Sequence, residues 1–272
     1  MKRRDFIFQG SAGIFSTVAT SSFTYSFPEP TEWQKDGLGS LGKIGILTPD
    51  FDPVPESEIR AMAPSGISIH SSRAKYIRNN PSSFVENVGN ATELLARVNP
   101  KVILYAFISS SYTLGVQAEQ ELIQQLEKIT NGIPVIVTSK AAIEAFRLFN
   151  ARKIAVIHPP WFLNEVNSKG KTYFESQDFD VVFCNQLTPL RDFTEVAPTE
   201  VYQWVKKNVP SEADVIFIAG NGLRTAGTIS KLEKEIKKPI LTSNQVLLWA
   251  ALQLFAEIPK VKNYGKLFDQ RK

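Results

Sequence analysis

A few side chains of this sequence have the chemistry to move a proton on a small molecule. His158 ends an apolar run and precedes Pro159-Pro160, and an imidazole titrates near neutral pH. Ser109 opens a run of three serines, which can act as nucleophiles only beside a base. His158 and Ser109 are therefore the candidate catalytic residues. The alternatives stay open that His158 is a structural partner and that the serines cap the next helix.

Carboxylates offer a second route, because Asp50 and Asp52 follow another apolar run and could serve as acid or base. With His158 they could also hold a cation, although three ligands from separate loops make a weak metal site. We therefore expect no metal and no cofactor.

The cysteine and histidine counts exclude other chemistry. Cys184 is the one cysteine and His70 is the one further histidine, so an intramolecular disulfide, a Cys-based cluster and a His-rich zinc site are all excluded. Cys184 directly follows the apolar residues Val181–Phe183, which favours a buried core residue. Gly220-Asn221-Gly222 lacks the spacing of a P-loop and is interpreted as a turn where a ligand approaches the backbone.

These residues follow strand-like segments in an alternating pattern. Short apolar runs alternate with amphipathic stretches, which predicts an α/β fold with parallel sheets covered on both faces. The predicted strands are Lys43–Thr48, Gly66–His70, Lys101–Phe107, Ile133–Thr138, Lys153–His158, Phe179–Cys184, Asp214–Ala219 and Pro239–Leu241. The predicted helices include Ser82–Val98, Val116–Thr130, Lys140–Phe149 and Thr199–Asn208.

The second half of this pattern repeats the first. Lys43–Ile46 corresponds to Lys153–Val156, and Val102–Ala106 corresponds to Val215–Ala219. The repeat predicts two pseudo-symmetric, doubly wound lobes at residues 43–150 and 151–272, with terminal elements exchanged between them. Ligands of such sheets bind outside the carboxyl ends of the strands. We therefore expect an interlobe cleft, lined by the segments Pro49–Pro53, Phe107–Ser111, His158–Phe162 and Gly220–Arg224.

The amino terminus has the pattern of an export signal. Lys2, Arg3 and Arg4 precede a stretch of apolar and small residues that continues to about Phe27 without an acidic residue. The paired arginines followed by Phe6-Ile7 resemble a twin-arginine signal, which implies export to the periplasm. We assign residues 1–27 to this signal and 28–42 to a linker, and expect no stable membrane insertion once the signal is removed.

The charge gives no support for nucleic acid as a partner. The formal net charge is +4 among 272 residues, and half of it comes from the first five. That excess is too small to indicate binding to nucleic acid or to an anionic membrane surface. The expected partner is a small molecule, and the sequence leaves the oligomeric state open.

The order of motifs resembles one branch of the aspartate/glutamate racemase superfamily, that of maleate isomerases and arylmalonate decarboxylases. The segments that carry the resemblance are Ile44–Pro49, Ala63–Arg73, Ile133–Ala141, Asn164–Asn167, Leu223–Thr225, Pro239–Asn244 and Tyr264–Asp269. The resemblance implies two α/β lobes and cysteines at the ends of central strands, which move a proton at the substrate's α-carbon. A thiol suits this reaction because its pKa can be lowered toward neutrality.

The resemblance also shows where this chain departs from the family. Phe107 and Gly220 stand at the two cysteine positions, and neither side chain can transfer a proton. Ile108 stands where a Thr or Ser is usual, and Phe162 where a Tyr is usual. The candidate ligand-binding residues implied by this alignment are Pro49, Asp50, Ser109, Ser110, Phe162, Asn221 and Gly222.

Three hypotheses of function remain. The first is an exported pseudoenzyme that has lost the thiol chemistry and binds a small carboxylate-like or aryl-bearing molecule in the cleft. The second is a cofactor-independent isomerase, racemase or decarboxylase with relocated catalytic residues. A weaker third is a structural protein whose cleft is plugged by Phe107.

Overall fold

The computed structural model describes residues 37–188, 195–257 and 260–270. The export signal predicted for residues 1–27 and most of the linker predicted for 28–42 lie outside the described residues. Within the described ranges, none of the helices combines the length and the apolar character needed to cross a membrane.

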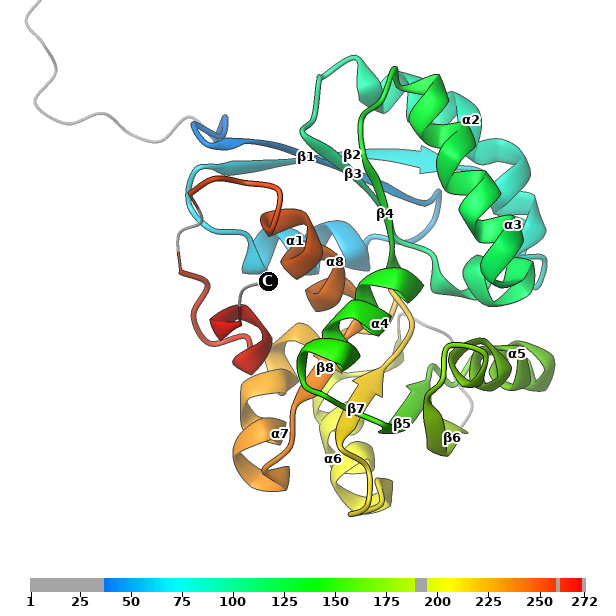
Figure 1. Ribbon diagram of the computed structural model, residues 1–272, viewed down its shortest axis with the longest axis vertical. Coiled ribbons are helices and arrows are strands. Elements are labelled where there is room, and N and C mark those ends of the chain that lie inside the picture. Colours follow the sequence, from blue (N-terminus) through cyan, green and yellow to red (C-terminus); the bar gives the residue numbers. More distant parts are fainter. Residues whose placement is uncertain (1–36, 189–194, 258–259, 271–272) are drawn as a thin grey trace, which may run out of the picture. The chain divides into compact units, whose positions relative to one another are not determined.

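Two four-stranded parallel sheets form the framework (Figure 1). Their strand orders are β2-β1-β3-β4 and β6-β5-β7-β8, so each half repeats the same topology. The predicted fold of two pseudo-symmetric parallel-sheet lobes is therefore confirmed. The strands are β1 Gly42–Pro49, β2 Ile67–Ala74, β3 Val102–Tyr105, β4 Val135–Val137, β5 Lys153–His158, β6 Asp180–Gln186, β7 Val215–Ile218 and β8 Ile240–Thr242.

Helices connect successive strands and cover both faces of each sheet (Figure 1). The α-helices are α1 Val54–Met62, α2 Ser82–Ala96, α3 Ile108–Ile129, α4 Thr138–Leu148, α5 Asn164–Glu175, α6 Pro198–Asn208, α7 Ile229–Ile236 and α8 Ser243–Leu252. Two short 3₁₀ helices are η2 Ala226–Thr228 and η3 Lys266–Asp269.

The central core joins the two lobes. Helix α8 follows the last strand of the second sheet, yet it packs against α1, α4, β3 and β4. Phe146 on α4 packs against Phe174 and Phe217 of the second half, at ring-centroid distances of 5.5 Å each. Because these side chains belong to one buried cluster, the lobes share a core that holds their strand ends at fixed positions.

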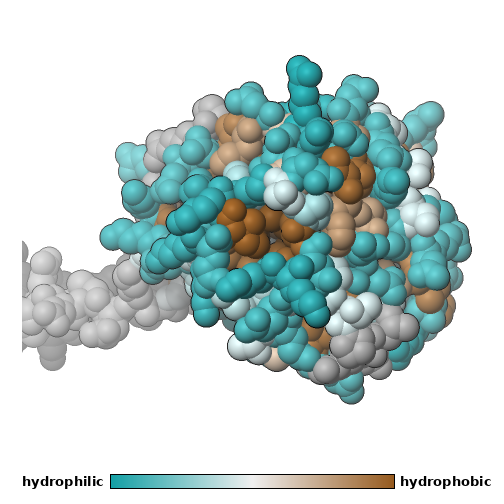
Figure 2. Space-filling view, turned by 90° about the horizontal axis from the view of Figure 1, so that it is seen from below, coloured by the Kyte–Doolittle hydropathy of each residue, from teal (hydrophilic) through white to brown (hydrophobic). Residues whose placement is uncertain are grey.

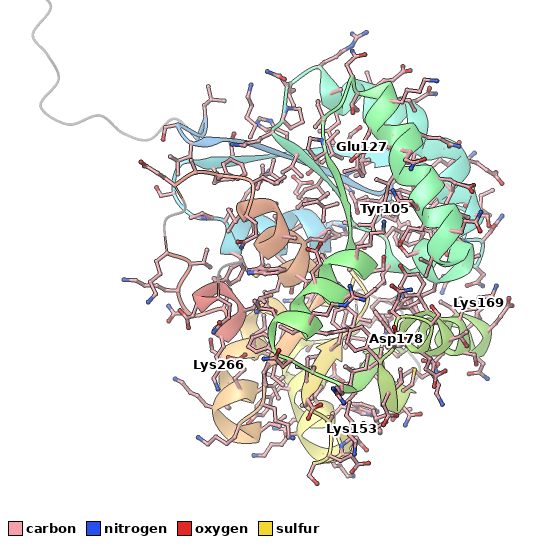
Figure 3. All side chains as sticks on the ribbon, viewed as in Figure 1. Tyr105, Glu127, Lys153, Lys169, Asp178 and Lys266 are labelled. Atoms are coloured by element: carbon pink, nitrogen blue, oxygen red, sulfur yellow. The ribbon has the colours of Figure 1, made fainter. Side chains whose placement is uncertain are left out.

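Figure 3 shows that side chains fill the space between the sheets and their helices, with Tyr105 inside this packing and Lys153 and Lys266 at the surface. Tyr105 is 1% exposed, whereas Lys153, Asp178 and Lys266 are exposed. The face seen in Figure 2 is mainly hydrophilic and carries separate hydrophobic patches.

The start of α3 extends beyond the sequence prediction. The predicted helix from Val116 is present, but a further helical stretch precedes it from Ile108, within the strand-end segment Phe107–Ser111. Gly115 interrupts it with φ 74° and ψ 174°, a conformation that favours glycine, so α3 is kinked there. The serines Ser109–Ser111 consequently lie in the first turn of a helix and not in a free loop.

Candidate ligand-binding cleft

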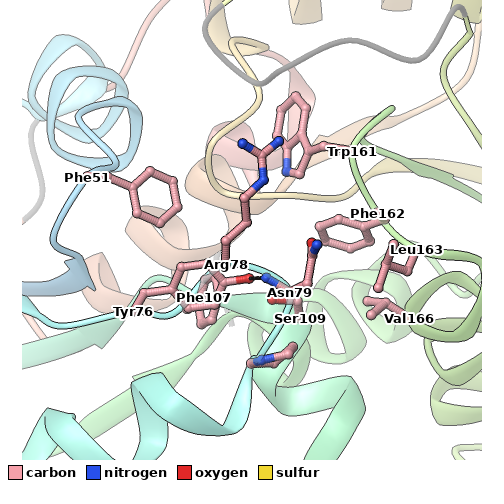
Figure 4. A pocket seen from close by; sticks show the side chains of 11 residues that line it. Phe51, Tyr76, Arg78, Asn79, Phe107, Ser109, Trp161, Phe162, Leu163 and Val166 are labelled. Carbon is pink, nitrogen blue, oxygen red and sulfur yellow. Dashed lines mark hydrogen bonds between the residues drawn. The ribbon is translucent and has the colours of Figure 1, made fainter.

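A cavity of about 300 Å³ opens between the lobes at the carboxyl ends of the strands. Its walls come from both halves of the chain, as Figure 4 shows. The lining residues are Phe51, Tyr76, Arg78, Asn79, Pro81, Phe107, Ser109, Trp161, Phe162, Leu163 and Val166. Three of the four predicted strand-end segments therefore contribute to this cavity, as expected for ligand sites in parallel α/β sheets.

A smaller recess of about 30 Å³ continues inward from the same walls. Phe51, Phe107, Ser109, Trp161 and Phe162 line both spaces. The recess adds a deeper set of residues, which consists of Asp52, Ile108, Gly220, Asn221 and Gly222. The fourth predicted segment thus lines the inner end of the cleft.

Aromatic packing gives the outer wall its form. The Phe107 ring lies 4.9 Å from the Phe84 ring and 5.1 Å from the Tyr76 ring, in edge-to-face geometry in both cases. Tyr76 in turn lies 5.4 Å from Phe51. Such pairs are favourable beyond the apolar area they bury, so Phe107 is held as a wall. It does not fill the cleft, because the 300 Å³ cavity remains beside it.

Gly220 has a backbone that excludes a side chain. Its φ is +93°, and a Cβ placed there would lie 2.1 Å from Pro159 Cγ. Real Cβ contacts are never this short, and the left-handed conformation adds strain for any other residue. Pro159, which follows β5, therefore occupies the space that a side chain at Gly220 needs.

Asp52 places a carboxylate in the recess. It is 4% exposed, its Oδ1 accepts a hydrogen bond of 3.0 Å from the Val54 N–H, and its Oδ2 lies against Gly222. Burial is the main cause that raises the pKa of Asp52 from 3.8 to about 6, and Glu58 adds to it. The Val54 hydrogen bond and the positive charge of Arg73 act in the opposite direction.

Asn221 crosses between the lobes and closes the inner end of the cleft. Its Oδ1 accepts the Ile108 N–H at 3.0 Å, and its Nδ2 donates to Thr138 Oγ1 and Asn244 Oδ1, both at 3.1 Å. The N–H that opens α3 is therefore satisfied within the protein. Helix N-termini commonly bind anions. Here the chain's own amide oxygen accepts the first of these N–H groups.

Glu58 extends this network from the first lobe to the second. Its carboxylate accepts the Ala226 N–H at 2.7 Å, the Thr225 N–H and the Asn244 Nδ2 at 2.9 Å. Burial raises the pKa of Glu58, while these hydrogen bonds lower it. Glu58 thus ties α1 to the segment after β7.

Comparison with known proteins identifies the family. The sequence model described as arylmalonate decarboxylase matches residues 65–268. The chain belongs to the arylmalonate decarboxylase family. It is 21% identical over 193 residues to arylmalonate decarboxylase of Bordetella bronchiseptica, covering 69% of this chain and 79% of that protein. It is 22% identical over 250 residues to maleate isomerase of Pseudomonas putida, covering 85% of this chain and 99% of that protein.

Solved structures share the fold of this family member. A variant of Nocardia farcinica maleate cis-trans isomerase with a covalently bound succinylcysteine intermediate has a TM-score of 0.77 at 20% identity, covering 85% of this chain and 99% of that chain. Unliganded arylmalonate decarboxylase has a TM-score of 0.72 at 20% identity, covering 84% and 99%. The resemblance to this branch is therefore confirmed.

Both cysteine positions that the resemblance implies lie at the cleft. Phe107 and Gly220 both line the recess. Phe107 presents an aromatic ring and Gly220 presents backbone at the positions where the resemblance implies thiols. The single cysteine, Cys184, is half-buried on β6, with its Sγ 3.8 Å from His158 Nδ1. Burial raises the pKa of the Cys184 thiol to about 11, so the thiol is neutral near pH 7. Neither cavity includes it.

His158 lies behind the cleft wall. It is fully buried, its ring stacks on Phe162 at 5.5 Å, and Nδ1 hydrogen-bonds Asn167 Oδ1. Nε2 lies 3.4 Å from the Tyr112 hydroxyl. Burial lowers the pKa of His158 to about 4. The ring is thus neutral near pH 7 and lines neither cavity, which is the arrangement of a structural partner.

The other predicted ligand-binding residues divide into two groups. Ser109, Phe162, Asn221 and Gly222 line the cleft. Pro49, Asp50 and Ser110 line neither cavity. Asp50 is exposed and accepts the Tyr76 N–H at 3.3 Å, while Ser110 Oγ contacts the Tyr105 hydroxyl at 2.7 Å. Among the residues that the structure describes, no group of three His, Cys, Asp or Glu side chains could hold a metal ion.

The sequence analysis missed the wall formed after β2. Tyr76, Arg78 and Asn79 lie between β2 and α2 and line the outer cavity. Figure 4 shows the Arg78 side chain reaching across the cavity, with its guanidinium toward Trp161. The signal was available, because this segment also leaves the carboxyl end of a strand.

Proposed function

We propose that this family member is exported and binds a small aryl-bearing molecule in the interlobe cavity without thiol chemistry. One observation carries the proposal: the family's cleft stays open as a cavity of about 300 Å³ with aromatic walls, while Phe107 and Gly220 occupy its reactive end. A cavity of this size and lining suits an apolar ligand with a few polar groups.

The backbone at Gly220 supports the absence of thiol chemistry. The space for a side chain there is taken by Pro159, so this loop accepts no cysteine without a shift of Pro159. At the other position, Phe107 belongs to a packed aromatic wall. Both features fit a cleft adapted to binding.

Ligand-induced stabilisation tests the binding function. A ligand that binds only the folded state raises the melting temperature in proportion to the logarithm of its concentration above Kd. Aryl-substituted small molecules should stabilise the protein, and Trp161→Ala, which alters both cavities, should reduce the effect. Trp204→Ala is the matched control, because Trp204 lines a separate surface groove on α6. Equal stabilisation of both variants would place the ligand outside the cleft.

A second candidate function is proton transfer by a relocated group. Asp52 favours it, because its carboxyl lines the recess and has a pKa of about 6, close to neutrality. Proton NMR in D₂O would then show loss of the α-proton signal of a bound carboxylic acid, and Asp52→Asn would abolish that exchange. Binding without exchange supports the first function alone.

Export is tested separately. Arg3 and Arg4 support a twin-arginine signal. A fusion of residues 1–42 to a reporter that is active only in the periplasm should depend on the twin-arginine translocase. Replacing both arginines by lysine should stop export, and unchanged export would rule out this route.

A further inference from the structure

The recess contains a buried carboxylate whose second oxygen has no donor. Asp52 Oδ1 is bonded to the Val54 N–H, but no hydrogen bond reaches Oδ2 from any residue in the described part of the chain. Oδ2 faces Gly222, where an added Cβ would lie 2.8 Å away. Because Oδ2 receives no hydrogen bond from the protein and Asp52 lines the recess, this oxygen is available to a ligand that donates.

The charged neighbours of Asp52 do not replace such a ligand. Arg73 donates to the backbone carbonyls of Asp52 and Pro49 at 2.9 and 3.3 Å, and to Glu56 at 3.0 Å. Its guanidinium is therefore engaged outside the carboxylate. Glu58 contributes negative charge, which further disfavours an anion near Asp52.

Two donors that could receive a carboxylate ligand at the inner end of the cleft are in use. The first N–H of α3, at Ile108, is taken by Asn221 Oδ1, and the Asn221 amide donates to Thr138 and Asn244. The hydroxyl of Ser109 remains at the recess, and it can accept as well as donate. The Asp52 carboxylate and the Ser109 hydroxyl are thus the side-chain groups of the recess that can accept from a ligand.

The walls of the recess add to this preference. Phe51, Phe107, Trp161 and Phe162 line both the recess and the outer cavity. Aromatic faces attract cations, and this attraction increases where water is excluded. The recess of about 30 Å³ has room for one group of roughly the size of a water molecule, such as an ammonium.

We propose that the recess binds the protonated amine of an arylalkylamine, with the ammonium on Asp52 and the aryl group in the outer cavity. This inference rests on the proposed binding function and names the class of its ligand. Arg78 lines the outer cavity and not the recess, so its charge does not compete for the ammonium position. A dicarboxylate would meet the Asp52 charge at the same place.

Three probes with one phenyl ring and different charge test the proposal. Isothermal titration at pH 7.5 would compare 2-phenylethylamine, 2-phenylethanol and phenylacetate on the full chain. We expect the amine to bind about 10- to 100-fold more tightly than the alcohol, as for a hydrogen bond to a charged group, and phenylacetate to bind most weakly. Asp52→Asn should remove the preference for the amine while the alcohol still binds.

Asp50→Asn is the matched control, because it makes the same charge change in the same loop at a residue that lines neither cavity. It should leave all three affinities within about twofold of the native values. If phenylacetate binds as tightly as the amine, or if Asp52→Asn leaves the amine's Kd unchanged, the charge assignment is overturned and the binding function stands. If none of the three binds at millimolar concentration and a wider aryl panel also fails, the binding function is overturned too.

Discussion

Replacing Asp52 with asparagine should change how the stability of the protein depends on pH. The carboxyl is 4% exposed, and burial raises its pKa from 3.8 to about 6. Between about pH 4 and pH 6, the Asp52 carboxyl is therefore still protonated in the folded state but already ionised in the unfolded state. Stability from this group is fully present below pH 4 and is lost as pH rises through 6.

The size of the effect follows from the two pKa values. The difference between 3.8 and about 6 corresponds to about 3 kcal/mol of unfolding free energy, of which roughly 2 kcal/mol falls between pH 4 and pH 7. Asparagine keeps an oxygen to accept the Val54 N–H, and its amide does not titrate. The stability difference between variant and native protein should therefore shift by about 2 kcal/mol in favour of the variant from pH 4 to pH 7.

Urea unfolding at several pH values measures this difference, with Asp50→Asn as the exposed control. The titrations of Glu58 and His158 remain in all three proteins, so their effects largely cancel in the comparison. A difference for Asp52→Asn that stays within about 0.5 kcal/mol across this range would mean that the carboxyl is well solvated. The argument for an unsatisfied carboxylate would then fail.

Three further substitutions test the cleft and its support. Gly220→Ala should destabilise the protein by about 1 to 3 kcal/mol, because it strains the backbone and brings the new Cβ against Pro159. Gly227→Ala is the control in the same urea assay and should have little effect, because nothing lies within 4 Å of a Cβ there. Asn221→Ala should cost about 1 to 3 kcal/mol because the buried Ile108 N–H loses its acceptor, which chemical unfolding would measure. His158→Ala should lower the stability at pH 7 without changing ligand affinity. The difference in unfolding free energy between native protein and variant should shrink by about 3 kcal/mol from pH 7 to pH 4, because the His158 pKa is about 4 in the folded state and 6.5 ordinarily. A loss of ligand affinity in His158→Ala would return that residue to the catalytic candidates.

The sequence allowed most strands to be predicted because the spacing of apolar residues is a local property, although β2 continues to Ala74, beyond its predicted end at His70. Apolar runs such as Lys153–His158 coincide with β5, and the repeat correctly paired β1 with β5 and β3 with β7. The helix start at Ile108 could not be predicted as easily. Three consecutive serines have low helix propensity, and the helix is held there by Asn221, which is 113 positions away.

The chemistry of the recess depended on contacts that local patterns do not contain. Asp50 and Asp52 have the same side chain two positions apart, yet one is exposed and the other is 4% exposed. The difference arises because Asp52 meets Gly222 from the second lobe. Likewise, His158 at a strand end suggested catalysis, but Phe162 and Asn167 place its ring behind the cleft wall.

Restoring a thiol at one position tests whether the surroundings still support acid/base chemistry. Phe107 has φ −152° and ψ 79°, which cysteine can adopt, whereas Gly220 cannot accept a side chain beside Pro159. Phe107→Cys in a Cys184→Ala background therefore gives one thiol at the recess. The rate of its alkylation as a function of pH reports its pKa.

Two effects compete at that thiol. The N-terminus of α3 stabilises a thiolate by about 1 kcal/mol or less, and the Ile108 N–H there is already bonded to Asn221. Asp52 lines the same recess, and a carboxylate a few ångströms from a thiol disfavours the thiolate by roughly 1 to 4 kcal/mol, depending on the effective dielectric. The Asp52 charge should prevail and hold the thiol pKa above its usual value of about 8.5. Adding Asp52→Asn should lower the midpoint of the alkylation curve. A midpoint near neutrality with Asp52 intact would mean that the recess still favours a thiolate, and that this family member lacks only the cysteine.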